Sequence, residues 1–316
     1  MSQPLAPLDP RLTEQRNPRT AEIDLAGPLD IVELLNAEDR TVAGAVSACR
    51  HEIARAIELV ETAFRAGGHL YYVGAGTSGR LGMLDAAECP PTFGTDPALV
   101  QGVIAGGYAA LVKSAERAED DFDAGAKAVD GKEAGPRDVV CGIAASGSTP
   151  YVRGAVTRAA ARGAKTVLLS CTDPPPDLLA NVDVAILPRV GPEALTGSTR
   201  LKAGTATKMV LNMVTTGAMI RWGRAYGNLM VDLRAQSVKL HDRGERIVME
   251  VCGVDRTSAR RAIDAAGGYV KTAIVMVKRQ VTRAEAERLL REAGGYARTA
   301  IGEGPPPVRA PAPGGA

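Results

Sequence analysis

Residues 69–86 read HLYYVGAGTSGRLGMLDA, a short apolar run followed by a glycine-rich loop and a helix-like stretch. Such a loop between a buried strand and a helix is typical of α/β folds, in which the first backbone N–H groups of the helix bind anions. The same arrangement recurs at ASGSTP (145–150), which also lies between an apolar run and a helical stretch. These two loops, with the runs around them, decide the fold class.

Short apolar runs alternate with helix-like stretches along the middle of the chain. The runs are 69–73, 98–104, 138–144, 165–170 and 183–188. Helical stretches are expected at 41–65, 78–86, 108–130, 149–163, 175–180, 198–222 and 229–251. Apolar strands that alternate with helices indicate a parallel sheet covered on both faces. The sequence therefore predicts an α/β fold with a doubly wound, five-stranded parallel sheet.

The regions on either side of this pattern define the predicted domains. Residues 1–40 are rich in proline and polar residues and are predicted to form an N-terminal arm, before an α/β domain at 41–240. Short helical periods predict a small helical C-terminal subdomain at 241–302. The Pro/Gly-rich tail, 303–316, is predicted to be disordered.

The composition excludes several classes of function. The chain has 316 residues and a formal net charge of +2, so no basic surface for nucleic acid is expected. Aromatic residues make up only 3%, which leaves few platforms for stacking bases. There is no apolar run of about 18 residues to span a membrane, and the first twenty residues lack an apolar signal region. We therefore expect neither a nucleic-acid nor a membrane partner.

Cysteine and histidine usage argues against disulfides and metals. The five cysteines are scattered and form no CxxC pair: Cys49, Cys89, Cys141, Cys171 and Cys252. This pattern is typical of a reduced, cytoplasmic protein. The three histidines belong to no HExxH motif or Cys/His cluster, so no metal site is expected. Acid–base chemistry is expected to rely on carboxylates.

The loop Gly74–Arg80 also matches G-x-G-x-x-G, the fingerprint of a dinucleotide site. That fingerprint requires an acidic residue about 20 positions further on, at the end of the second strand. The second apolar run instead ends VIAGG (103–107), without an acid. Two hydroxyl-bearing loops at helix starts favour a phosphate over a nicotinamide cofactor, and N-capping by Ser or Thr is the alternative.

Longer motifs surround these loops: TEQRNPRT (13–20), YVGAGTSGRLGMLDAAECPPTFG (72–94), IAGG (104–107), GPEALTGSTRLKAGTATKMVLNM (191–213) and NLMVDL (228–233). Together they resemble the N-acetylmuramic acid 6-phosphate etherase family, whose core is a sugar isomerase (SIS) domain. The resemblance covers about residues 13–300. It implies a lyase of peptidoglycan recycling that cleaves the D-lactyl ether of N-acetylmuramate 6-phosphate without metal or cofactor. It also implies a homodimer with composite active sites.

The resemblance assigns roles to individual residues. The two functional glutamates of the family match Glu88 in AAECPPT and Glu119 in ERAEDD, and Glu116 is the position most easily confused with Glu119. The expected phosphate ligands come from the two loops: Gly76, Thr77, Ser78, Gly79, Ser146, Gly147, Ser148 and Thr149. Three residues of the segment 191–202 are candidates for holding the sugar: Glu193, Ser198 and Thr199. Ser198 or Thr199 as a simple helix cap is the alternative.

Without the resemblance, the glutamates have ordinary interpretations. A surface carboxylate at a helix end is then the less favoured interpretation of Glu88, whereas a solvated charged face is the favoured interpretation of Glu119. We expect Pro90 to hold Cys89 in extended geometry, and Cys89 to be a bystander and not a nucleophile. His241 is a candidate for opening the sugar ring, although a surface role is favoured.

The expected chemistry is an elimination followed by addition of water. An opened ring exposes an aldehyde at C1 that acidifies the C2 proton, so one carboxyl group can remove it while another protonates the leaving lactyl oxygen. Glu88 is expected to be the main acid–base residue and Glu119 to assist. Two other functions use the same scaffold: a non-catalytic, sugar-phosphate-sensing SIS regulator, and an aldose–ketose isomerase, which would not need the segment around Glu88.

Overall fold

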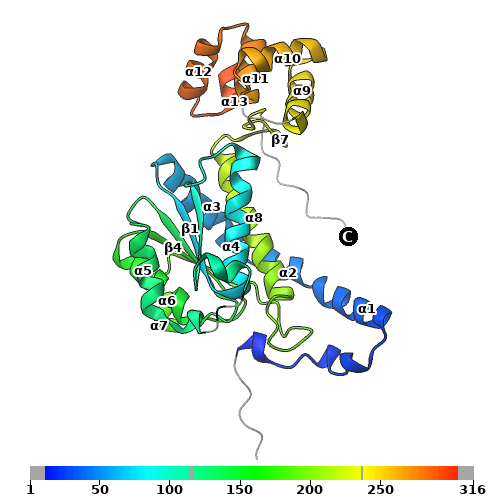
Figure 1. The fold of residues 1–316 in the computed structure, drawn as a ribbon, viewed down its shortest axis with the longest axis vertical. Coiled ribbons are helices and arrows are strands. Elements are labelled where there is room, and N and C mark those ends of the chain that lie inside the picture. The colour runs from blue at the N-terminus through cyan, green and yellow to red at the C-terminus, as the bar shows by residue number, and fades with distance from the viewer. Residues whose placement is uncertain (1–10, 114, 116, 236–237, 305–316) are drawn as a thin grey trace, which may run out of the picture. The chain divides into compact units, whose positions relative to one another are not determined.

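The structure is a computed structural model that describes residues 11–113, 115, 117–235 and 238–304 (Figure 1). The chain divides into two compact units. The first contains residues up to Cys89 together with Asp96–Ala218, and the second contains Pro90–Thr95 and the residues from Met219 onward. The domain boundaries proposed from the sequence at 40/41 and 240/241 stay predictions. Of the expected disordered tail, residues 305–316 lie outside the described residues.

The first unit contains a five-stranded parallel sheet with strand order β2-β1-β3-β4-β5. The strands are β1 (Leu70–Gly74), β2 (Val100–Ile104), β3 (Val139–Ile143), β4 (Lys165–Leu169) and β5 (Val184–Ile186). Every residue of β1 and β3 is buried, as expected for central strands that are covered on both faces. The predicted doubly wound, five-stranded sheet is confirmed.

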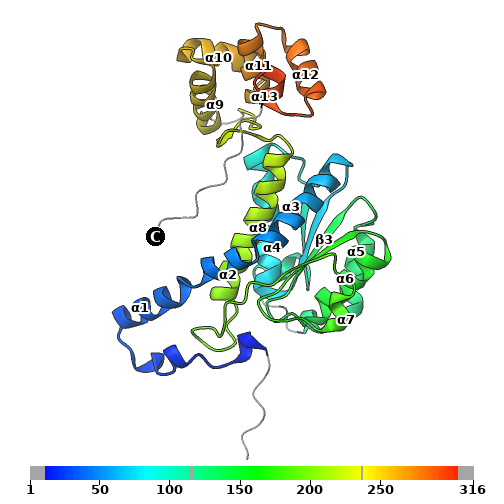
Figure 2. The ribbon, with the colours of Figure 1, turned by 180° about the vertical axis from the view of Figure 1, so that it is seen from behind.

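Helices cover both faces of this sheet (Figures 1 and 2). The helices up to residue 221 are α1 (Pro28–Asp39), α2 (Val42–Ala48), α3 (Arg50–Arg65), α4 (Gly76–Phe93), α5 (Phe122–Gly131), α6 (Pro150–Ala161), α7 (Pro176–Leu179) and α8 (Lys202–Arg221). Of these, α1 extends away from the sheet (Figures 1 and 2). Short 3-10 helices occur at Leu12–Glu14, Pro18–Thr20, Ile23–Leu25, Tyr108–Leu111 and Ala118–Asp120. Successive side chains of β1 point to opposite faces of the sheet. Tyr71 therefore packs in the hydrophobic cluster that includes Tyr151 of α6, whereas Tyr72 packs against Gly82 of α4.

The strand order explains where a ligand can bind. Because β1 lies between β2 and β3, the chain leaves β1 into α4 on one face and leaves β3 into α6 on the other. A crevice opens at such a switch point, beyond the carboxyl ends of the strands. The loops after Gly74 and Ile143, which are paired in register, meet there.

The second unit is largely helical, as expected for the C-terminal region. It contains the two-stranded hairpin β6 (Ala225–Tyr226) and β7 (Leu229–Met230), then α9 (Val238–Cys252), α10 (Arg256–Ala265), α11 (Val270–Arg279), α12 (Arg283–Glu292) and α13 (Ala297–Ile301). Its core includes Leu233, Val248, Ile263 and Ile274. No helix among the described residues of either unit is long and apolar enough to cross a membrane.

Two helical hairpins of this unit share one sequence pattern. Residues 255–274 read DRTSARRAIDAAGGYVKTAI and residues 282–301 read TRAEAERLLREAGGYARTAI. Each begins with a side-chain cap, from Asp255 or Thr282, to the backbone N–H three residues later. Each turns through two glycines with positive φ, at 267–268 and 294–295. The hairpins are therefore structural repeats, and the glycine pair in each supplies the left-handed turn conformation.

Three helical stretches depart from the sequence-based expectation. The stretch 108–130 is not one helix, because Arg117 has a positive φ and interrupts it; Tyr108–Leu111 is a 3-10 helix, and only the second part of the stretch forms α5. The stretch 229–251 begins with β7, since pairing with β6 overrides its helical periodicity, and α9 starts later. The helix expected at 41–65 is broken at Cys49, which lies between α2 and α3.

Helix α4 is longer than expected. The sequence suggested an end near residue 86 and an extended Cys89 before proline, but α4 continues through Pro90 and Pro91 to Phe93. The N–H of Gly94 donates to the carbonyl of Pro90 at 2.9 Å, which keeps the last turn hydrogen-bonded. The expectation of an extended Cys89 is therefore wrong, and Glu88 lies on a helix.

Candidate active site

The first loop is held close to the sheet by glycines. A Cβ added to Gly74 would lie 2.7 Å from the N of Gly79, and one added to Gly79 would lie 2.8 Å from the carbonyl oxygen of Gly74. Gly76 has φ +52°, the left-handed conformation that favours glycine, and α4 begins at this residue. The first-turn N–H groups of α4 therefore point into the crevice, where they favour an anion.

The second loop also needs a glycine at its turn. Gly147 has φ +71°, and a Cβ there would lie 2.9 Å from the Ser170 hydroxyl oxygen. The hydroxyl of Ser148 donates to that of Ser146 at 3.4 Å. Thr149 occupies the N-cap position of α6, but its side chain makes no capping hydrogen bond. The capping alternative is therefore not realised at Thr149, and its hydroxyl is available to a ligand.

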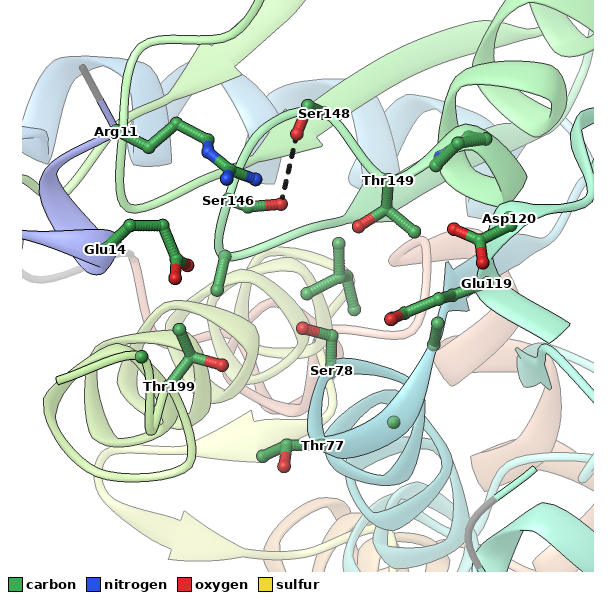
Figure 3. Close-up of a pocket in the computed structure, with 16 residues that line it drawn as sticks. Arg11, Glu14, Thr77, Ser78, Glu119, Asp120, Ser146, Ser148, Thr149 and Thr199 are labelled. Carbon is green, nitrogen blue, oxygen red and sulfur yellow. Dashed lines mark hydrogen bonds between the residues drawn. The ribbon is translucent and has the colours of Figure 1, made fainter. Parts of the chain in front are cut away.

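Both loops line one cavity of ≈ 360 Å³ (Figure 3). The lining residues are Arg11, Glu14, Ala75, Gly76, Thr77, Ser78, Glu119, Asp120, Ile143, Ala145, Ser146, Ser148, Thr149, Pro150, Gly197 and Thr199. The structure thus brings together most of the residues selected from the sequence. In Figure 3 the hydroxyls of the two loops lie between Arg11 on one side and Glu119 on the other.

Two of the predicted phosphate ligands shape the cavity without lining it. Gly79 and Gly147 are buried and allow close backbone approach, but neither is among the lining residues. Ser198 is also absent from the lining, and its N–H donates to the carbonyl of Leu195 at 2.9 Å. Its neighbour Thr199 does line the cavity.

Glu193 lies under the third polar segment and caps α8. Its carboxylate accepts the N–H groups of Lys202 and Ala203, each at 2.9 Å, and its side chain is fully buried. Burial raises the pKa of Glu193, against the two backbone hydrogen bonds that lower it. Because both carboxylate oxygens already have partners, Glu193 positions the start of α8 in this structure and does not line the cavity.

Glu88 is not in the lining of the cavity of its own chain. It lies on the exposed side of α4, ten residues after Ser78, which corresponds to roughly 15 Å along a helix axis. The neighbouring Cys89 is buried, and burial raises the pKa of its thiol to about 12. A protonated, buried thiol agrees with the expected bystander role. Glu116 lies outside the described residues.

The N-terminal segment forms a wall of the cavity that sequence reasoning missed. Arg11 and Glu14 line the cavity, and Figure 3 shows the guanidinium of Arg11 directed toward Ser146. Hydrogen bonds fasten the segment to the third polar segment: Asn17 Nδ2 donates to the Pro192 carbonyl at 3.2 Å, and Thr20 Oγ1 to the Ala194 carbonyl at 2.8 Å. The motif TEQRNPRT (13–20) contains Glu14, Asn17 and Thr20, so its polar character was the available signal for them, whereas Arg11 precedes the motif.

Asp85 connects α4 to the sheet and to α8. Its carboxylate accepts hydrogen bonds from the Tyr72 hydroxyl at 3.0 Å, from Asn212 Nδ2 at 2.6 Å and from the Thr215 hydroxyl at 3.3 Å. Burial raises the pKa of Asp85, opposed by these hydrogen bonds. The network holds the helix that carries both Ser78 and Glu88.

His241 lies on α9 and lines a different cavity with Asp242 and Glu245.

A doubly wound parallel sheet whose switch point holds two hydroxyl loops at helix N-termini defines an anion-binding α/β protein of the SIS class. In agreement, residues 52–160 match the family described as Glucokinase regulatory protein N-terminal SIS domain. The N-acetylmuramic acid 6-phosphate etherase of Klebsiella aerogenes is 52% identical over 84% of this chain and 88% of its own length. That of Salinibacter ruber is 53% identical over 85% of this chain and 86% of its own. The chain belongs to the N-acetylmuramic acid 6-phosphate etherase family.

Among solved structures, the Vibrio vulnificus NanR protein complexed with ManNAc-6P is similar with a TM-score of 0.44 and 16% identity, over 64% of this chain and 67% of that chain. That likeness is too low to bear on function.

Proposed function

We propose that this protein cleaves the D-lactyl ether of N-acetylmuramate 6-phosphate to give N-acetylglucosamine 6-phosphate and D-lactate. The observation that carries the proposal is the identity of about half of the residues to relatives named for this activity, over most of both chains. The cavity supports it, because hydroxyls and helix N-termini suit a phosphate while carboxyl groups nearby suit proton transfer.

In this proposal the two loops hold the phosphate. The hydroxyls of Thr77, Ser78, Ser146, Ser148 and Thr149 donate to phosphate oxygens, with the first N–H groups of α4 and α6 behind them. Arg11, the only lysine or arginine among the described residues that line the cavity, adds a charge-assisted contact. Thr199 faces the sugar from the third polar segment. The phosphate anchors the substrate and leaves its reacting carbons free to approach the carboxyl groups.

The bond that breaks joins C3 of the opened sugar to the lactyl oxygen. A carboxylate removes the C2 proton, the electron pair forms the C2–C3 double bond, and the C3–O pair leaves on the lactyl oxygen, which takes a proton. Water then adds at C3 of the unsaturated aldehyde and a proton returns to C2. Each positioned proton transfer contributes about 10²–10⁴-fold to the rate. Glu88 is the proposed main acid–base residue, and Glu119, which lines the cavity, assists.

The position of Glu88 supports a shared site in a homodimer. Glu88 and Leu84 are four residues apart on α4 and therefore share a face of the helix. Leu84 is 54% exposed, so this face of α4 presents an apolar side chain next to the carboxylate. We propose that a second copy covers this face and that Glu88 acts on the cavity of that copy. Light scattering is expected to give about twice the chain mass of 32.9 kDa.

We also propose that the reaction takes place in the cytoplasm, as part of peptidoglycan recycling. The five cysteines form no disulfide among the described residues, a pattern typical of proteins in a reducing compartment. A second candidate function is a non-catalytic, sugar-phosphate-sensing regulator, favoured by the match of residues 52–160 to a regulatory SIS domain. Only the etherase would convert N-acetylmuramate 6-phosphate to products, so a measurement of turnover distinguishes the two functions.

The test is release of D-lactate from N-acetylmuramate 6-phosphate, with and without EDTA. Wild type is expected to release D-lactate in both conditions, whereas Glu88→Gln and Glu119→Gln lose about 10²–10⁴-fold in rate. Glu58→Gln, an exposed carboxylate on α3, is the matched control and is expected to retain full activity. Binding of the sugar phosphate without release would overturn the etherase proposal in favour of the sensor.

A further inference from the structure

A second cavity of ≈ 240 Å³ adjoins the first behind the GAGTSG loop. Both cavities are lined by Ala75, Gly76 and Glu119, so Glu119 stands where they meet. The remaining lining residues of this side chamber are Arg80, Ala105, Ala110, Ala115, Arg117 and Ala118. Its volume is several times the roughly 30 Å³ that one water occupies in the liquid. The chamber is therefore large enough for a small substituent of a ligand that sits in the first cavity.

The lining of the side chamber combines methyl groups with positive charge. Five of its nine lining residues are alanines, and two are arginines. A Cβ added to Gly106 would lie 2.6 Å from the Cβ of Ala115 and 3.3 Å from that of Ala110, so this wall is closely packed. A group that fills the chamber thus meets an apolar surface and a guanidinium. That pairing suits a small carboxylate-bearing substituent with a methyl group.

Arg80 fixes the wall of the side chamber. It is the fifth residue of α4, and its Nη2 and Nε donate to the carbonyls of Ala110 at 2.8 Å and Leu111 at 3.0 Å. Arg117, on the other side, has the left-handed φ of 65° at the N-cap of the turn that carries Glu119. An arginine held in this strained conformation is typical of a functional site. The Arg80 guanidinium is therefore held by backbone carbonyls, whereas Arg117 lines the chamber without taking part in those hydrogen bonds and is the arginine assigned to a ligand.

We infer that the side chamber receives the D-lactyl group, with its methyl against the alanines and its carboxylate toward Arg117. This inference rests on the proposed function. The substrate carries two substituents beside the breaking bond, the lactyl group at C3 and the acetamido group at C2. Only the lactyl group is charged, so only it uses the guanidinium. With the lactyl group in the chamber, Glu119 lies next to the departing oxygen, as its assisting role requires.

The first test fills the chamber. Ala115→Leu places a larger side chain at an exposed position of the lining, and Ala109→Leu, exposed but outside the lining, is the matched control. We expect Ala115→Leu to lower kcat/KM for N-acetylmuramate 6-phosphate at least about tenfold. The affinity for N-acetylglucosamine 6-phosphate, which lacks the lactyl group, is expected to change less than about twofold by calorimetry. Ala109→Leu is expected to resemble wild type in both.

The second variant removes the charge. Arg117→Gln is expected to raise KM for the substrate about tenfold and to leave the affinity for N-acetylglucosamine 6-phosphate unchanged. Loss of N-acetylglucosamine 6-phosphate binding in Ala115→Leu, with glucosamine 6-phosphate binding retained, would assign the chamber to the acetamido group and overturn the inference. Unchanged kinetics in both variants would also overturn it. If wild type releases no D-lactate, the proposed function itself fails, and the chamber variants play no part in that result.

Discussion

The Nζ of Lys202, at the start of α8, lies 2.6 Å from Oε2 of Glu38, near the end of α1. Both side chains are buried, with 1% and 2% of their surface exposed. Arg19 Nη2 donates to the same carboxylate oxygen at 2.8 Å. One buried carboxylate between two cations thus joins the N-terminal segment and α1 to α8. Arg11, Glu14 and Thr199 line the cavity and belong to the segments next to these residues in the chain. The ion pair therefore helps to hold the wall of the cavity in place.

Glu38 is expected to make stability depend on acid pH. The hydrogen bond from Arg19 lowers the pKa of Glu38 to about 2, against desolvation that raises it. A carboxyl with a depressed pKa stabilises the fold above its unfolded value of about 4.5, and this contribution is lost as pH falls toward 2. Glu38→Gln is therefore expected to lower the unfolding free energy by about 3–5 kcal/mol at pH 7, and by less than half of that at pH 3.

Urea unfolding at the two pH values measures this difference. Glu33→Gln, an exposed carboxylate on the same helix, is the control and should change stability by less than about 0.5 kcal/mol. An equal effect of Glu38→Gln at pH 7 and pH 3 would contradict the ionic role.

The hydroxyl cradle is expected to act on substrate affinity. Ser148→Ala removes one hydroxyl from the cavity, and a hydrogen bond to a charged group contributes about 1.5–3 kcal/mol. We therefore expect KM for the sugar phosphate to rise about 10–100-fold, with a smaller change in kcat. Thr196→Ala, in the third polar segment and outside the lining, is the control. A variant that loses kcat at unchanged KM would place Ser148 elsewhere in the reaction.

Arg11 is expected to contribute charge to phosphate binding. Its guanidinium is directed toward Ser146 (Figure 3), and Arg11→Gln should weaken binding of inorganic phosphate and of the sugar phosphate about tenfold. Because an exposed charge is screened by salt, the difference from wild type should shrink between 0.05 and about 1 M salt. Arg16→Gln, also in the segment but outside the lining, serves as the comparison. Equal phosphate affinity in both variants would remove Arg11 from the site.

Mixed dimers test the sharing of active sites. Glu88→Gln and Glu119→Gln chains are each expected to lose about 10²–10⁴-fold of their activity alone, and Glu119 lines the cavity. If Glu88 serves the cavity of the other copy, a mixed dimer joins an intact cavity to an intact Glu88 and regains activity at one of its two sites. Mixing the two proteins under conditions of subunit exchange is therefore expected to restore D-lactate release. No recovery in confirmed mixed dimers would place Glu88 and the cavity in the same chain.

Local sequence patterns were sufficient for the sheet and for the hydroxyl-bearing part of the cavity lining. The runs that became β1 to β5 are apolar because both faces of a parallel sheet are covered, and Gly76 and Gly147 mark turns that need positive φ. The loops after β1 and β3 meet because their strands are neighbours at the switch point, a rule that holds for any doubly wound sheet. Thr77, Ser78, Ser146, Ser148 and Thr149 could therefore be selected from the sequence.

Patterns failed where distant segments decide the outcome. Pairing of β6 with β7 overrode a helical period, and nothing in the local sequence of Glu193 distinguished a sugar ligand from the cap of α8 that it forms. The hairpins at 255–274 and 282–301 share a sequence pattern, and the structure adds that the paired glycines of both turns have positive φ.

The fold class and the chemistry of the two loops follow from local sequence, because periodicity, glycine turns and hydroxyls at helix starts act over a few residues. Only the tertiary structure decided that Arg11 and Glu14 close the cavity, that Lys202 is buried against Glu38, and that Glu88 lies outside the cavity of its own chain. These outcomes depend on hydrogen bonds and ion pairs between residues far apart in the chain. Such hydrogen bonds and ion pairs contribute to stability only after the fold has brought their partners together, so no local sequence pattern predicts them.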